Sequence, residues 1–429
     1  MKIPRRLDEL LPAAAMEKVL EVLQQPDISH RVREAFHKVG LSESAPLDKV
    51  KDAWQQARGW LDSLTGAAAR TTDSPTALNA TGQLLPAALD SLPCSPAVAY
   101  AYSQAASHFL SSASRQSRAD AAAADALGEH GFAWLASTAE AVRLVASSTA
   151  GSEGIVISRA DAVRIPGLGD VRAMLPSHGN RILEIGAANG VSPADWQGGL
   201  TCSPQLLLLT SPNSLSQEEA ARHRAAGIAA ARGCGARVVE LLADGVLHPG
   251  LAAGLSLPLA QQRLASGAQA LILPLHLLLG APSGALVIGE KSLVAAVARV
   301  AESTGANLRG PALAAATMAL QLSTQDDTLQ SGIPAQLLAN PQNLRDRARR
   351  MAVQLSGVGL IAQALETEHK TQLGGTPWNR YPLTSWAVRL TSKSSLEALE
   401  QQLRDGARRQ GLTIETARDD QALLLDLRF

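Results

Sequence analysis

The chain has 429 residues, of which 46% are hydrophobic and only 3% aromatic, so its interior must be built mainly from Ala, Leu and Val. Lys+Arg and Asp+Glu balance at 39 each. A net charge of zero argues against a large electrostatic surface for nucleic acid or for an anionic membrane. The length predicts two or three domains.

Residues 1–70 are predicted to form a helical domain. The segments "LDELLPAAAMEKVLEVL" and "LDKVKDAWQQARGWLDSL" place apolar side chains three and four positions apart, as amphipathic helices do. Trp54 and Trp60 are interpreted as packing residues of these helices. A polar linker, "TGAAARTTDSP", follows and ends at Pro75.

Two patterns bear on localisation. Charges recur every few residues at the start of the chain, which lacks the apolar core of a secretory signal. No run reaches the roughly 18 apolar residues that a membrane-spanning helix needs. We therefore expect a cytoplasmic protein with no membrane association.

Strands and helices alternate over residues 71–305, the predicted large domain. Short, almost continuously apolar strands are expected in "EGIVISR", "NRILEIG", "PQLLLLTSP", "ARVVELLADG", "QALILPL" and "GALVIGE". Ala-rich helices such as "SQEEAARHRAAGIAAARGCG" separate several of them. This alternation predicts an α/β fold with a mostly parallel sheet that is covered on both faces.

Residues 306–429 are predicted to form a small α+β domain. A long helical region begins near residue 306 and continues to the strand "SWAVRLT". The helix "SLEALEQQLRDGARRQG" and the strands "LTIETA" and "ALLLDLRF" complete the domain.

The cysteines indicate neither disulfides nor a metal site. Cys94, Cys202 and Cys234 are odd in number and scattered along the chain, without ligand spacing. We expect buried, reduced thiols and predict no metal centre.

Several strings, taken in order, resemble the bacterial selenocysteine synthases, the L-seryl-tRNA(Sec) selenium transferases. They span residues 78 to 390, and no one of them is decisive by itself. The strings are "LNATG", "SRQSR", "VISRADAVRI", "LEIGAAN", "LLGAPSGALVIGEK", "IPAQLLANPQNLRDRA" and "QLGGTPWNRYPLTSWAV". The resemblance implies a fold-type I, aminotransferase-like three-layer core and a family that uses pyridoxal phosphate.

The same resemblance aligns Leu277 with the lysine that forms the Schiff base to the cofactor. Leucine has no amine for that bond or for proton transfer. Lysine is absent from residues 52 through 290, and Lys291 lies one strand beyond the turn, roughly 20 Å away at about 3.3 Å per residue. His276 should point to the opposite face of the chain and is interpreted as a hydrogen-bonded structural histidine.

Other family positions also depart from the pattern. The resemblance aligns Leu241 with the aspartate that faces the pyridinium nitrogen, and Thr210 with the histidine that stacks on the ring. Asp244 comes three residues after Leu241 and is interpreted as a loop or N-cap residue.

Four residues could persist from the cofactor site. Asn213 and Arg309 match family positions. Ser137 and Thr138 stand at a predicted helix N-terminus, where backbone amides could hold a phosphate. The alternative for Ser137 and Thr138 is that they simply cap the helix.

The sequence therefore predicts a non-catalytic homologue that acts as a binding, scaffold or regulatory protein. We expect no cofactor, or pyridoxal phosphate if the alignment at Leu277 is wrong. The alternative is an active L-seryl-tRNA(Sec) selenium transferase, or another transferase or lyase on the same fold. The resemblance implies a homo-oligomer, with an active homologue as a further partner. A tRNA partner has little support, because residues 1–60 hold ten Lys/Arg against nine Asp/Glu.

Overall fold

The computed structural model describes residues 76–86, 88–89, 92–149, 154–176, 181–201, 206–212, 215–330, 332–373 and 380–429. The helices predicted over residues 1–70, with Trp54 and Trp60, lie outside this part of the chain, as do Cys202 and Asn213. The domain bounds 1–70, 71–305 and 306–429 stay a prediction. Ala77–Phe429 form one compact unit.

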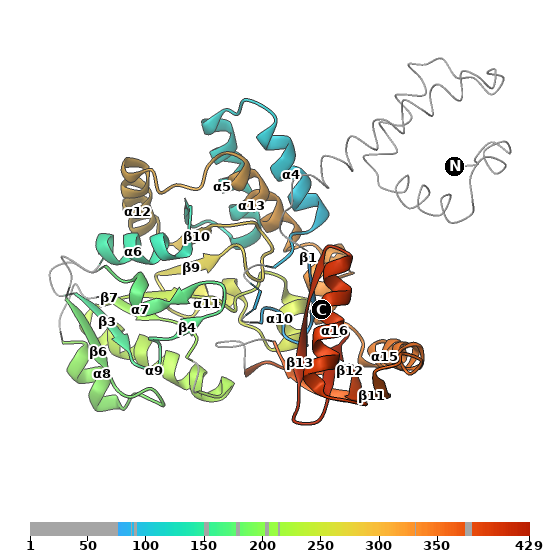
Figure 1. Ribbon diagram of the computed structural model, residues 1–429. Helices are drawn as coiled ribbons and strands as arrows, with labels where there is room; N and C mark the ends of the chain where they lie inside the picture. Colours follow the sequence, from blue (N-terminus) through green and yellow to red (C-terminus); the bar gives the residue numbers. More distant parts are fainter. Residues whose placement is uncertain are drawn as a thin grey trace, which may run out of the picture. The chain divides into compact units, whose positions relative to one another are not determined.

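A seven-stranded sheet forms the centre of this unit, in the order β2-β10-β9-β8-β7-β3-β6 (Figure 1). The strands from β9 to β6 are parallel, whereas β10 is antiparallel to both of its neighbours. The prediction of a mostly parallel sheet is confirmed. The strand bounds are β2 Gly131–Leu135, β3 Ile155–Ser158, β6 Ile182–Ile185, β7 Leu206–Leu209, β8 Arg237–Leu241, β9 Ala270–Pro274 and β10 Ala285–Gly289.

Helices cover both faces of the sheet, so the core has three layers. Leu206 and Leu208 of β7 point to one face, which is covered by α6 (Thr138–Thr149), α7 (Val171–Met174) and α12 (Lys291–Thr304). Leu207 and Leu209 point to the other face. This alternation is the period of two expected of a strand that is buried on both sides.

The second face is divided between two sets of helices. α8 (Pro193–Gly199) and α9 (Gln217–Cys234) cover it beside β7 and β8. Beside β9 and β10 it is covered by α5 (Ser112–Leu127), α11 (Ala260–Ala265) and α13 (Gly310–Leu322). The remaining helices are α4 Pro96–Ala106, α10 Pro249–Leu255, η1 Asp326–Gln330, α14 Gly332–Leu337, α15 Pro341–Leu355 and α16 Leu396–Arg409. Among the described residues, no helix combines the length and the apolar character needed to cross a bilayer.

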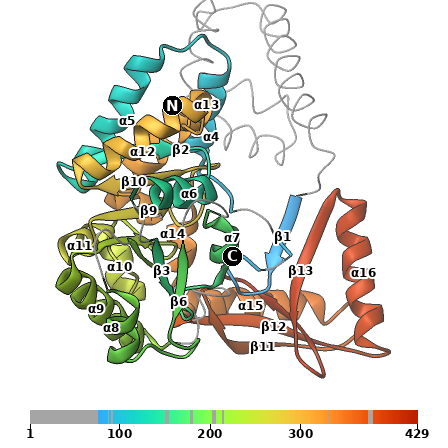
Figure 2. The same cartoon turned by 90° about the vertical axis from the view of Figure 1, so that its left-hand side faces the viewer.

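The C-terminal sheet has the order β1-β13-β14-β12-β11 and packs against α15 and α16 (Figure 2). Its strands are β1 Thr76–Ala80, β11 Ile361–Gln372, β12 Pro382–Ser392, β13 Leu412–Arg418 and β14 Leu423–Asp426. A short ribbon of β4 (Arg164–Ile165) and β5 (Gly169–Asp170) stands apart. β1 therefore belongs to this sheet although it precedes the large core in sequence, and α13 packs on α4 and α5.

One secondary-structure prediction is wrong. The segment 361–372 was expected to be helical, yet it forms β11, which pairs along its length with β12. Its sequence, "IAQALETEHKTQ", is rich in helix formers. Tertiary pairing with an apolar strand outweighs that local preference.

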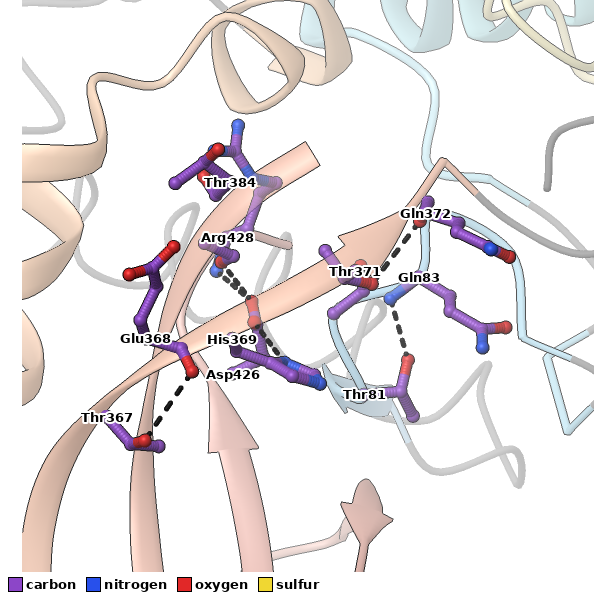
Figure 3. A network of polar contacts seen from close by, with 12 residues as sticks. Thr81, Gln83, Thr367, Glu368, His369, Thr371, Gln372, Thr384, Asp426 and Arg428 are labelled. Atoms are coloured by element: carbon purple, nitrogen blue, oxygen red, sulfur yellow. Dashed lines mark hydrogen bonds and ion pairs between the residues drawn. The ribbon is translucent and has the colours of Figure 1, made fainter. Parts of the chain in front are cut away.

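The "LNATG" string forms a turn that is held against the end of the chain. Gly82 has φ +79°, and a Cβ placed on it would lie 2.9 Å from Oδ2 of Asp426. That carboxylate accepts hydrogen bonds from Ser385 Oγ and from the Arg428 amide, each at 2.9 Å, and pairs with His369 Nδ1 at 2.8 Å (Figure 3). Gly82 is thus required both by its backbone conformation and by the closeness of Asp426.

The substitution Gly82→Ala should destabilise the protein by more than about 2 kcal/mol. The alanine would be strained by the positive φ, and its Cβ would also push Asp426 away from its hydrogen-bond partners. Gly305→Ala is the matched control. Gly305 also has a positive φ, +72°, but nothing lies within 4 Å of the added Cβ, so its cost should be about 1 kcal/mol. Urea unfolding midpoints measure both variants, and equal losses would contradict the role given to Asp426.

Candidate functional site

The most probable place for a ligand in an open parallel sheet is the crevice at the carboxyl ends of the strands, where the strand order reverses. Here the chain runs outward from β3 to β6 and returns on the other side of β3 as β7. The reversal therefore lies between β3 and β7.

Asp161 lies at this reversal, just after β3. It is 0% exposed, and its Oδ1 accepts a 2.8 Å hydrogen bond from the Thr210 amide. Its Oδ2 accepts from Ser158 Oγ at 2.6 Å and contacts His223 Nε2 at 2.7 Å. The Thr210 hydroxyl donates to the Asp161 carbonyl at 2.8 Å. Thr210, which aligns with the ring-stacking histidine, thus belongs to a buried network that joins β3, β7 and α9.

Leucines occupy the two positions that the resemblance aligns with the cofactor's covalent and electrostatic anchors. Leu241 ends β8 and Leu277 lies in the turn after β9, and both are buried in the same apolar cluster as Leu85. A Cβ placed on Gly167 would lie 3.1 Å from Leu277 Cδ2 and 3.0 Å from Leu85 Cδ2. The residues present supply neither an amine nor a carboxylate, so they do not fit pyridoxal phosphate.

Within the described residues, the lack of an amine near this turn does not depend on the alignment register. The lysines of the described residues are Lys291, Lys370 and Lys393, and all three are exposed. Lys291 begins α12 and pairs with Glu129 at 3.6 Å. Gly289, two residues before it, lies opposite Ala270, the first residue of β9. Lys291 is therefore at the end of the sheet opposite to the turn that holds Leu277.

Ser137 and Thr138, the two residues predicted at a helix N-terminus, stand at the start of α6. Ser137 Oγ accepts a 3.1 Å hydrogen bond from the Glu140 amide, so Ser137 caps α6. Thr138 is buried, and within the described part of the chain its hydroxyl has no partner. Arg309 is exposed and immediately precedes α13. Asn213, the fourth candidate, lies outside the described residues.

Asp244 lies in a loop, one of the two settings predicted for it. It lies in the turn after β8 and is buried. Its carboxylate accepts hydrogen bonds from Ser211 Oγ at 2.6 Å and from the Tyr381 hydroxyl at 2.5 Å. It is a loop residue, as expected, but it binds two side chains instead of capping a helix. Burial and the negative charge of Asp244 raise the pKa of Tyr381, so this hydroxyl stays protonated and donates.

His276 is hydrogen-bonded through one ring nitrogen. Its Nε2 donates to the Gly167 carbonyl at 3.2 Å. Its Nδ1 is buried, and none of the described residues pairs with it. The described residues thus supply a hydrogen-bond partner for Nε2 of His276 but not for Nδ1, so the interpretation of His276 as a hydrogen-bonded histidine is supported at one of its two ring nitrogens.

A polar cavity lies beside the leucine cluster, and sequence reasoning missed most of its residues. Its charged lining consists of Arg224, Glu240, Asp244, Arg263 and Arg380. Glu240 carried a signal that could have revealed it. A single carboxylate within the apolar strand "RVVEL" must be paired when that strand is buried.

Cys94 and Cys234 are unpaired thiols in the structure. Burial raises the pKa of Cys94, which disfavours its thiolate. Among the described residues, no three His, Cys, Asp or Glu side chains gather as metal ligands would.

Comparison with known proteins places the chain in a family. The profile of the L-seryl-tRNA selenium transferases matches residues 79–429. The chain belongs to this family. The L-seryl-tRNA(Sec) selenium transferase of Solidesulfovibrio magneticus is 27% identical over 307 residues, which cover 68% of this chain and 63% of that protein. The Moorella thermoacetica protein of the same name is 28% identical over 296 residues, 68% of this chain and 62% of its own length. These matches therefore span less than two thirds of either relative.

A solved structure supports the fold. D-glucosaminate-6-phosphate ammonia-lyase superposes with a TM-score of 0.59 at 16% identity, covering 82% of this chain and 91% of that one. The predicted fold-type I, aminotransferase-like α/β class is confirmed. At this identity the likeness concerns the fold alone.

If Leu277 fills the cleft as a core residue, Leu277→Ala should cost about 2–5 kcal/mol of unfolding free energy, as other buried leucine truncations do. Leu365→Ala is the control, because Leu365 lies on β11 with 48% of its surface exposed, and it should cost less than about 0.5 kcal/mol. Urea denaturation measures both. A Leu277→Ala variant as stable as the control would mean that the cleft is open.

Proposed function

We propose that this chain is a non-catalytic member of the L-seryl-tRNA selenium transferase family, and that it acts as a binding, scaffold or regulatory protein. One observation carries the proposal. The turn after β9 holds the buried Leu277, and every lysine of the described residues is exposed elsewhere.

The chemistry of the family explains why this matters. When bound through a lysine, pyridoxal phosphate acts as an electron sink for the bonds broken at the substrate. Holding it requires an amine, and keeping the ring nitrogen protonated requires an opposing carboxylate. Leu277 and Leu241 provide neither, and both side chains are at most 1% exposed. We therefore propose that the chain binds no pyridoxal phosphate covalently.

The alternative is the family's own activity, selenium transfer to L-seryl-tRNA(Sec), or another transferase or lyase reaction on the same fold. The extent of the family match, residues 79–429, favours it. It would require an amine from outside the described residues, where Lys2, Lys18, Lys38, Lys49 and Lys51 are found.

The proposed partners follow from the same reasoning. We propose a homo-oligomer and, since a non-catalytic copy can regulate a catalytic one, assembly with an active homologue. Binding of tRNA has less support, because the charges of residues 1–60 nearly balance.

The experiment is a selenium-transfer assay with L-seryl-tRNA(Sec) and a selenium donor, run beside the Moorella thermoacetica relative as reference enzyme. We expect no product from this chain alone, because its described residues offer no lysine for covalent catalysis. Light scattering of the same preparations reports the oligomeric state. Turnover by this chain at a rate near that of the reference would refute the non-catalytic assignment.

A further inference from the structure

We propose that the polar cavity beside the leucine cluster binds a compact oxyanion, either a free tetrahedral ion or the carboxylate of a small molecule. This goes beyond the proposed function, which names no ligand, and it holds whether or not the chain is catalytic. The cavity has a volume of about 110 Å³, which is well below the roughly 300–1,000 Å³ of pockets for larger ligands.

The cavity lies at the carboxyl ends of β7 and β8, on the face of the sheet that α9 and α11 cover. Its lining includes Thr210 and Ser211 after β7, Glu240 in β8, and Tyr381 from the segment before β12. Neighbouring residues of a strand point to opposite faces. Glu240 therefore faces this cavity, whereas Leu241 points into the leucine cluster on the opposite face of β8.

Three arginines from separate elements reach this one space. Arg224 comes from α9, Arg263 from α11, and Arg380 from the segment before β12. Their side chains are 12%, 28% and 8% exposed. They face two carboxylates, Glu240 and Asp244, so the described lining carries one net positive charge.

The existing contacts fix two of the arginines without using all of their donors. Arg224 Nε donates to Glu240 at 2.8 Å, and its Nη2 donates to the Arg263 carbonyl at 3.1 Å. Arg263 Nη1 pairs with the other Glu240 oxygen at 3.6 Å. Within the described residues, no partner is found for Arg224 Nη1 or for Arg263 Nε and Nη2. Guanidinium groups held in place with free donors are prearranged for an oxyanion.

The two carboxylates are already occupied, so they do not repel an anion as free charges would. Glu240 faces Arg224 and Arg263. Asp244 accepts from two hydroxyls and has Arg380 Nη2 at 3.9 Å. Burial raises the pKa of Glu240, and the charges of Arg263 and Arg224 oppose that shift.

One polar residue of the lining has an unusual backbone conformation. Ser256 lines the cavity and has φ 56° and ψ 33° at the C-cap of α10. Among the described residues it is the one non-glycine residue with positive φ. Glycine would avoid a cost of about 1 kcal/mol at this position. The lining thus includes a serine at the left-handed end of a helix, where glycine is usual.

The test uses the full chain and measures its melting temperature with inorganic phosphate, sulfate or acetate, against chloride at equal ionic strength. We expect a saturable rise for the wild type. Phosphate and sulfate acting without acetate would indicate a tetrahedral ion, and the opposite pattern a carboxylate. Either pattern supports the site, whereas no saturable effect of any anion would overturn it.

Three variants locate the site. Arg263→Gln removes a donor but leaves Arg224 on Glu240, and anion affinity should fall about tenfold or more. Arg222→Gln on α9, the helix of Arg224, is the control, since Arg222 is 68% exposed and pairs with Glu218. Ser256→Gly should weaken binding while keeping or raising the melting temperature without anion, a combination that a purely structural role does not produce.

Two outcomes would contradict the assignment. The first is an equal anion affinity in Arg263→Gln and Arg222→Gln. The second is loss of anion binding in Thr138→Val but in none of the cavity variants, which would place the anion at the start of α6. Failure of this proposal leaves the leucine-filled cleft unaffected. A covalent pyridoxal phosphate adduct would contradict the proposed function without bearing on this cavity.

Discussion

The packing of Leu277 is the contact on which our account of the core depends, because it joins the turn after β9 to the main apolar cluster. A lysine at this turn would need a polar partner and space for a ring, and the strands around it would have to leave that space open. A leucine instead extends the apolar cluster from Leu241 through Leu277 to Leu85. The core thereby gains burial at the carboxyl ends of the central strands, where other members of this fold class keep a cleft.

The polar groups at this edge of the sheet are satisfied in three different ways. Asp161 is surrounded by a histidine, a hydroxyl and an amide, Asp244 by two hydroxyls, and Glu240 by two arginines. The first two carboxylates have side-chain partners that fill their coordination and fix loops in place. Glu240 differs, because its partners retain unused donors. The same edge of the sheet therefore holds an apolar cluster on one face of β8 and, on the opposite face, a cavity lined by three arginines.

Much of the fold could be predicted from the sequence. The strands β3, β7, β9 and β10 were recognisable because burial on both faces leaves an almost continuous run of apolar residues. β11 was not, since its Glu- and Lys-bearing residues face outward and only pairing with β12 makes it a strand. The absence of lysine from residues 52 through 290 was visible directly. The arginine cavity could not be predicted, because Arg224, Arg263 and Arg380 meet only after α9, α11 and the C-terminal segment have packed together.

The measurement that tests the central claim most directly is the absorbance spectrum of the purified chain with added pyridoxal phosphate, followed by borohydride reduction and peptide mass spectrometry. A chain whose cleft is filled by Leu241 and Leu277 should show no internal-aldimine band and no site-specific reduced adduct. A stoichiometric adduct at a single lysine, abolished when that lysine is changed to arginine, would contradict the claim and restore the chain to the catalytic members of its family.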